Sequence, residues 1–130
     1  MNEIQSLHQQ AMHLAEQAEV AKLRGGTSDQ VQALLQQAFD RESQAAALVA
    51  PSLDSEPTRS VIHRSAASLA IDCGDFQSAE RLIAIALSGN PPAEIADELK
   101  DLFVQINLPQ YCERRGFHLN LQELTLSSIN

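Results

Sequence analysis

The sequence has few aromatic residues, with four Phe, one Tyr and no Trp among 130 residues. Hydrophobic residues nevertheless make up 44% of the chain, close to the average for soluble globular proteins. The core must therefore be built from Leu, Ile, Val and Ala. A chain of this length is expected to form one ordinary domain that buries a core without disulfides or a structural metal.

Basic residues are also scarce, since nine Lys and Arg stand against seventeen Asp and Glu and give a net charge of -8. This balance excludes a broad basic face that neutralises phosphates, so nucleic acid is not an expected partner. No apolar run approaches the roughly 20 residues that span a bilayer. The first five residues lack the basic and then apolar order of a signal peptide. We expect a cytoplasmic protein without a membrane partner.

Cysteine is limited to Cys73 and Cys112, and neither sits in a paired motif that would indicate a disulfide framework or a zinc site. Cys73 is expected to be a small buried thiol, because no neighbouring cation or histidine would lower its pKa. Cys112 lies beside Arg114 and Arg115, but an exposed or half-buried structural thiol is the favoured interpretation. A redox role of the two thiols stays open.

The four histidines are scattered and form no reactive set. His8 and His13 lie five residues apart, about 140° around a helix axis, so they cannot share a metal ion. His63 lies among apolar positions and is expected to be a partly buried packing residue. We therefore expect no metal, no cofactor and no enzymatic activity.

Apolar residues spaced three and four apart predict a helix from Ile4 to Leu23, which ends at Gly25 and Gly26. Thr27 and Gln30 form the pattern of a capping box for a second helix, which continues to Val49. Glu42 is the one polar interruption in its apolar stripe. A linker with two prolines follows. The two helices are predicted to form an antiparallel hairpin over residues 3–49.

A second hairpin is predicted over residues 57–89. Its first helix opens at Pro57 and ends before Gly74, and its second begins at Phe76 and ends at Gly89. A closing helix, with one apolar and one charged face, is predicted over residues 92–106. In this helix the stretch from Glu98 to Leu102 marks the boundary between the two faces rather than a site.

Beyond Pro109 the apolar pattern changes to a period of two. Two short strands forming a β-hairpin are one interpretation, and a short helix over residues 122–127 is the other. An isolated strand pair is marginal in water, so strands would pack on the helices or pair with another chain. Residues 107–130 are thus expected to form a C-terminal appendage. Its candidate oligomerisation residues, which would support a homodimer, are Phe117, Leu119, Leu121, Leu124 and Leu126.

Small residues recur through Ser60–Pro92, where Ala67 and Ala70 precede the turn Gly74-Asp75-Phe76. After the turn the pattern continues with Ala79, Ile83, Ala86 and Pro91. This segment resembles a tetratricopeptide repeat, in which alanines at the crossing points bring two antiparallel helices close together. It departs from that family at His63, Ala66 and Ala70, where bulky residues are usual. The first hairpin fits only with a longer loop around residues 24–28.

The resemblance implies an all-α, antiparallel helical-hairpin stack of about five helices. Residues 64–83 and 90–99 also resemble a group of bacterial proteins of unassigned function, which implies a bacterial source and supplies no activity.

In tetratricopeptide proteins the first helix of each hairpin lines a concave groove. By resemblance, the second hairpin would contribute Val61, Arg64, Ser68 and Ile71. The first hairpin would contribute Gln9, Met12, Glu16 and Glu19, although plain solvated helix residues are the favoured alternative there. This implies a non-catalytic protein-protein interaction module that binds a peptide or segment of a protein partner, with Arg64 pairing a carboxylate. The alternative is a small subunit or regulator of an obligate assembly that associates through its C-terminal segment.

Overall fold

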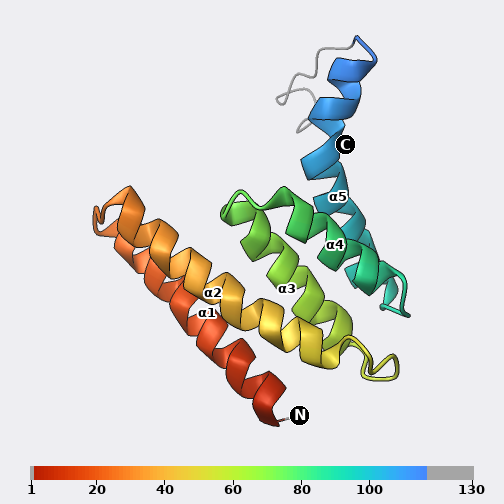
Figure 1. Cartoon of the computed structure of the whole chain (residues 1–130), viewed down its shortest axis with the longest axis horizontal. Helices are drawn as coiled ribbons and strands as arrows, with labels where there is room; N and C mark the ends of the chain where they lie inside the picture. Colours follow the sequence, from red (N-terminus) through yellow and green to blue (C-terminus); the bar gives the residue numbers. More distant parts are fainter. Residues whose placement is uncertain (1, 117–130) are drawn as a thin grey trace.

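The computed structural model describes residues 2–116, which form five α-helices in succession (Figure 1). No strand occurs within this range, so the all-α prediction is confirmed for it. The helices are α1 (Asn2–Leu23), α2 (Ser28–Val49), α3 (Thr58–Asp72), α4 (Phe76–Leu87) and α5 (Ala93–Arg114).

Each helix packs against its neighbour in sequence: α1 on α2, α2 on α3, and α3 on α4. Helix α5 contacts both α3 and α4. In Figure 1 the α1–α2 pair lies beside α3, and α4 lies on the other side of α3. Both predicted hairpins are therefore present, and α3 is the helix that contacts both the first hairpin and α5.

The two hairpin turns share one backbone geometry. Gly25 and Gly74 both have φ of +77°, a left-handed conformation that favours glycine. Each glycine N–H donates to the carbonyl three residues earlier, and the next N–H donates to the carbonyl five residues earlier. This pattern, the Schellman motif, ends α1 and α3 and turns the chain back along the helix it has just formed.

Side chains cap the N-termini of three helices. The capping box predicted at Thr27 is confirmed, because its Oγ1 accepts from Gln30 N–H while Gln30 Oε1 accepts from Thr27 N–H. At the start of α4 the Asp75 carboxylate accepts from both the hydroxyl and the N–H of Ser78, and these two hydrogen bonds lower the Asp75 pKa. At α3 the predicted first residue, Pro57, precedes the helix by one position, and the Glu56 carboxylate accepts from Ser60 N–H.

The core is built mainly from small aliphatic residues, as the shortage of aromatics predicts. The first core cluster joins the two hairpins and consists of Ile4, Ala45, Ala46, Val49, Ile62 and Ala66. The second core cluster holds α5 on the second hairpin and consists of Ala67, Ile83, Ala86, Ile95 and Leu99. Ala67, Ala70, Ala79 and Ala86 are fully buried, which lets the backbones of α3 and α4 approach closely.

One buried cation connects the two hairpins. Arg59, at the start of α3, is only 3% exposed. Its Nε donates to the Ala50 carbonyl at the end of α2 (2.8 Å), and its Nη2 donates to the Ile85 carbonyl in the last turn of α4 (3.2 Å). Carbonyls at helix C-termini lack intrahelical partners and carry partial negative charge. The guanidinium therefore satisfies the ends of two helices at once.

Two neighbours fix the position of this arginine. A Cβ added at Gly89 would overlap Arg59 Nη1, so the absence of a side chain there makes room for the guanidinium. His63, one turn further along α3 and 1% exposed, donates from Nδ1 to the Arg59 carbonyl (2.7 Å). Burial lowers the pKa of His63, so the imidazole is neutral at pH 7. The prediction that His63 is a packing residue is confirmed, with more complete burial than expected.

The predicted end of the closing helix at residue 106 was wrong, because α5 continues to Arg114 with Pro109 inside it. Proline removes the N–H that would bond to the carbonyl four residues earlier, at Gln105. Both Gln105 and Pro109 are exposed, so water can solvate the freed carbonyl and the helix continues at little cost. The C-terminal part of α5 extends beyond the α3–α4 hairpin (Figure 1).

The C-terminal strand or helix predicted within residues 117–127 lies outside the described residues. None of the helices from α1 to α5 is long and apolar enough to cross a membrane.

Replacing Arg59 with methionine tests the connection between the hairpins. The variant leaves the Ala50 carbonyl without its donor, whereas the Ile85 carbonyl keeps the bond from the Ser88 hydroxyl (2.7 Å). We expect it to lower the free energy of unfolding by about 1 to 3 kcal/mol. Arg41→Met, at an exposed position on α2, is the matched control and should change stability by less than about 0.5 kcal/mol. Urea denaturation followed by circular dichroism measures both, and equal stabilities of the two variants would contradict the role of Arg59.

Candidate functional site

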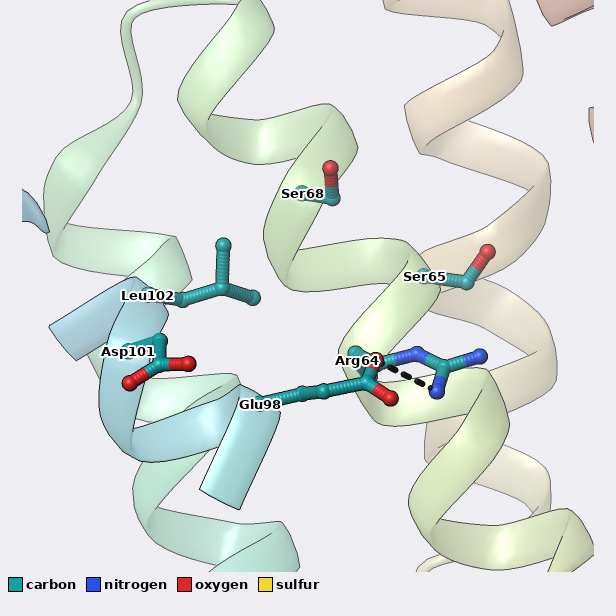
Figure 2. A pocket seen from close by; sticks show the side chains of 6 residues that line it. All are labelled: Arg64, Ser65, Ser68, Glu98, Asp101 and Leu102. Carbon is teal, nitrogen blue, oxygen red and sulfur yellow. Dashed lines mark hydrogen bonds and ion pairs between the residues drawn. The ribbon is translucent and has the colours of Figure 1, made fainter. Parts of the chain in front are cut away.

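A recessed groove lies between α3 and α5, with a volume of about 420 Å³. We call it the α3–α5 groove (Figure 2). The α3 wall carries Arg64, Ser65 and Ser68, and the α5 wall carries Glu98, Asp101 and Leu102. Spacings of three and four along each helix place these side chains on one face. The groove therefore combines one cation, two carboxylates, two hydroxyls and an apolar wall.

An ion pair bridges the groove at one end. Arg64 Nη1 donates to Glu98 Oε2 at 2.8 Å (Figure 2), and the two side chains are 31% and 53% exposed. An exposed pair of this kind contributes only about 0 to 1 kcal/mol to stability. Its larger effect is to orient the guanidinium, because the remaining N–H groups of Arg64 stay available as donors.

The structure brings together only half of the groove residues predicted for the second hairpin. Arg64 and Ser68 line the α3–α5 groove. Val61 packs against the second core cluster instead, and Ile71, which is half-buried, does not line the groove. In the first hairpin Gln9, Glu16 and Glu19 are exposed.

Sequence reasoning missed the α5 wall of this groove, since Glu98 to Leu102 was interpreted as a boundary between two helix faces. The signal available was an acidic pair three residues apart next to a leucine. That Arg64 lies opposite, 34 positions earlier, follows only from the packing of α5 on α3.

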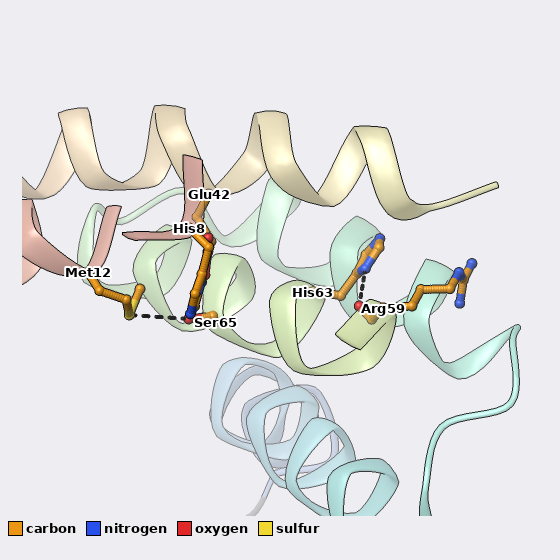
Figure 3. Close-up of polar contacts among 6 residues, drawn as sticks. All are labelled: His8, Met12, Glu42, Arg59, His63 and Ser65. Carbon is orange, nitrogen blue, oxygen red and sulfur yellow. Dashed lines mark hydrogen bonds and ion pairs between the residues drawn. The ribbon is translucent and has the colours of Figure 1, made fainter. Parts of the chain in front are cut away.

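Behind the α3 wall lies a buried polar cluster (Figure 3). Glu42, the polar interruption of the α2 stripe, is fully buried, and its Oε2 and Oε1 lie 2.7 and 3.0 Å from His8 Nδ1. The hydroxyl of Ser65, a groove residue, lies 4.0 Å from the Sδ of Met12 on α1. Met12 is half-buried. The cluster thus connects α1 and α2 to the groove.

The charge state of Glu42 is set by opposing effects. Burial raises the pKa of its carboxyl, while hydrogen bonds from Ser65 and His8 and the charge of His8 lower it. Burial is the largest effect, so the pKa lies above its ordinary value. The carboxylate can be retained inside the fold because His8, on α1, is placed to compensate its charge.

The described residues give no support for metal or thiol chemistry at this site. No three His, Cys, Asp or Glu residues between positions 2 and 116 are grouped to hold a metal ion. Cys73 is half-buried, and burial together with the nearby carboxylates of Asp72, Asp40 and Asp75 raises its pKa, which opposes thiolate formation. Cys112 is buried, not exposed or half-buried as expected.

No family model, curated protein or solved structure matches this chain. The tetratricopeptide resemblance and the resemblance to bacterial proteins of unassigned function therefore stay predictions.

The raised pKa of Glu42 predicts a pH-dependent effect of Glu42→Gln, which resembles the protonated side chain in shape and charge. A carboxyl with a raised pKa in the folded state holds its proton more tightly there than in the unfolded chain. The wild type therefore loses stability relative to the variant as the pH rises above the ordinary value of 4.5.

Urea denaturation at pH 4.5 and pH 7.5 measures this difference. We expect the free energy of unfolding of Glu42→Gln, minus that of the wild type, to be larger at pH 7.5 than at pH 4.5. A stability difference that is constant with pH, or that changes in favour of the wild type as the pH rises, would contradict the raised pKa.

Proposed function

We propose that this protein is a non-catalytic interaction module with a tetratricopeptide-like arrangement, and that the α3–α5 groove binds a segment of a protein partner. The observation that carries the proposal is the groove itself. Two helices from different parts of the chain supply a recessed surface with an apolar wall at Leu102 and an arginine oriented by Glu98.

The groove chemistry suits a polypeptide segment better than a small molecule. The polar groups of the groove are spread over both walls instead of converging on one point. An extended or helical segment offers carbonyl and carboxylate oxygens to Arg64, hydrogen-bonding groups to Ser65 and Ser68, and an apolar side chain to Leu102. In this proposal Arg64 is the central donor to the partner.

The acidic character of the chain favours a partner segment that carries a positive charge. The net charge is -8, and Asp101, an exposed groove residue, forms no ion pair with another of the described residues. A segment that places a cation near Asp101 and an acceptor at Arg64 fits both walls.

Assembly through residues 117–126, the alternative function, stays a prediction because those residues lie outside the described part of the chain.

Site-specific photo-cross-linking tests whether the groove is occupied. A photoreactive amino acid replaces Ser68 in the full chain, expressed in its native cell, and a second variant carries it at Gln37, an exposed α2 position outside the groove. We expect a discrete cross-linked polypeptide at Ser68 and none at Gln37. The absence of a cross-link at Ser68, or the same product at both positions, would contradict the proposal.

The cross-linked partner then allows a test of Arg64. Arg64→Ala should weaken binding by about fivefold or more, since a charge-assisted hydrogen bond to the partner is lost. Glu98→Gln removes the ion pair but keeps the arginine, so binding should be largely retained. Arg41→Ala, on the exposed surface of α2, is the charge control.

Isothermal titration measures the three affinities. Unchanged binding by Arg64→Ala would contradict a contact between Arg64 and the partner. Equal losses in Arg64→Ala and Glu98→Gln would also contradict it, because they would show that the ion pair acts only by holding α5 against α3.

A further inference from the structure

Helix α5 carries an exposed apolar face toward its C-terminal end. Phe103, Val104 and Tyr111 are 45%, 47% and 45% exposed, although the other side of α5 packs on the second core cluster through Leu102 and Ile106. A cavity of about 280 Å³ runs along this face. Its lining residues, which define the outer face of α5, are Phe103, Val104, Asn107, Leu108, Tyr111 and Arg114.

The backbone at the end of α5 has the same geometry as the two hairpin turns. Gly116 has φ of +76°, and its N–H donates to the Glu113 carbonyl at 3.1 Å. Gly25 and Gly74 have the same φ within one degree and the same bond to the carbonyl three residues earlier. At both of these glycines the chain turns back and packs against the helix that precedes it. Gly116 therefore ends α5 with the backbone geometry that ends α1 and α3.

The sequence after Gly116 carries apolar residues at the spacing needed to cover the outer face. Phe117, Leu119 and Leu121 alternate with polar residues, so an extended chain would place all three on one side. Residues 117–130 contain no Lys or Arg and one acidic residue, Glu123. They therefore bring no like charge to Arg114, at the end of the outer face.

The length of the outer face also matches the length of this apolar segment. Val104, Leu108 and Tyr111 lie along one line of the helix and span about 10 Å at a rise of 1.5 Å per residue. Three alternating apolar residues of an extended chain span about 13 Å. Because this segment is joined directly to α5, its effective concentration at the outer face is in the millimolar range, well above that of a second copy at ordinary concentrations.

We propose that the outer face of α5 is a docking site for residues 117–126 of the same chain. Docking covers Val104, Leu108 and Tyr111 with the alternating apolar side chains and makes the C-terminal segment part of the folded monomer. This proposal does not depend on the α3–α5 groove, which lies on another side of α5 and is tested separately.

Tyr111 gives a direct probe, since it is the one tyrosine and the sequence has no tryptophan. Acrylamide quenching of its fluorescence in the full chain measures how far the outer face is covered. The doubly substituted variant Leu119→Asp, Leu121→Asp should release the segment and raise the quenching constant by about twofold or more. The matched control, His118→Asp with Asn120→Asp, adds the same charges at the polar positions and should leave the quenching constant unchanged.

A second pair of variants tests the same contact from the helix. Val104→Asp should also raise the quenching constant, whereas Gln105→Asp, its exposed neighbour, should not. Equal quenching in all variants would overturn the proposal, as would a quenching constant that rises on dilution together with the loss of a dimer mass in light scattering. The latter result would show that a second copy covers the outer face.

Discussion

The arrangement of this protein depends on one buried cation. Arg59 joins the C-terminal carbonyls of α2 and α4 from its place at the start of α3. Since these carbonyls belong to different hairpins, the guanidinium is a polar link between them beside the apolar, alanine-rich first core cluster. Small side chains fix how closely helices approach but define their axial register weakly. Directional hydrogen bonds from a buried arginine supply that register.

The position of α3 in turn determines the candidate site. Once α3 is held between α2 and α4, its remaining face meets α5, and the offset between these two helices forms the α3–α5 groove. The buried Glu42, paired with the half-buried His8, supports the same face from behind through Ser65. The groove is therefore shaped by the connection between the hairpins as much as by its own lining residues.

Much of the fold could be predicted from the sequence because its determinants are local. The apolar spacing, the Thr27 capping box and the glycines at 25 and 74 act within a few residues of where they occur. The length of α5 could not be predicted, since whether Pro109 ends a helix depends on whether the freed carbonyl of Gln105 reaches water. The α5 wall of the groove could not be predicted either, because Arg64 and Glu98 meet only through the packing of α5 on α3. Glu42 was visible as an interruption, but its partner His8 lies 34 residues away.

Native-state hydrogen exchange tests the central claim, that Arg59 and the core around it make the two hairpins one cooperative unit with α3 at its centre. The account predicts that amides in the middle of α2, α3 and α4 exchange with a common free energy of opening, equal to that of global unfolding. Separate opening of the α1–α2 hairpin at a free energy well below that of α3 and α4 would contradict it.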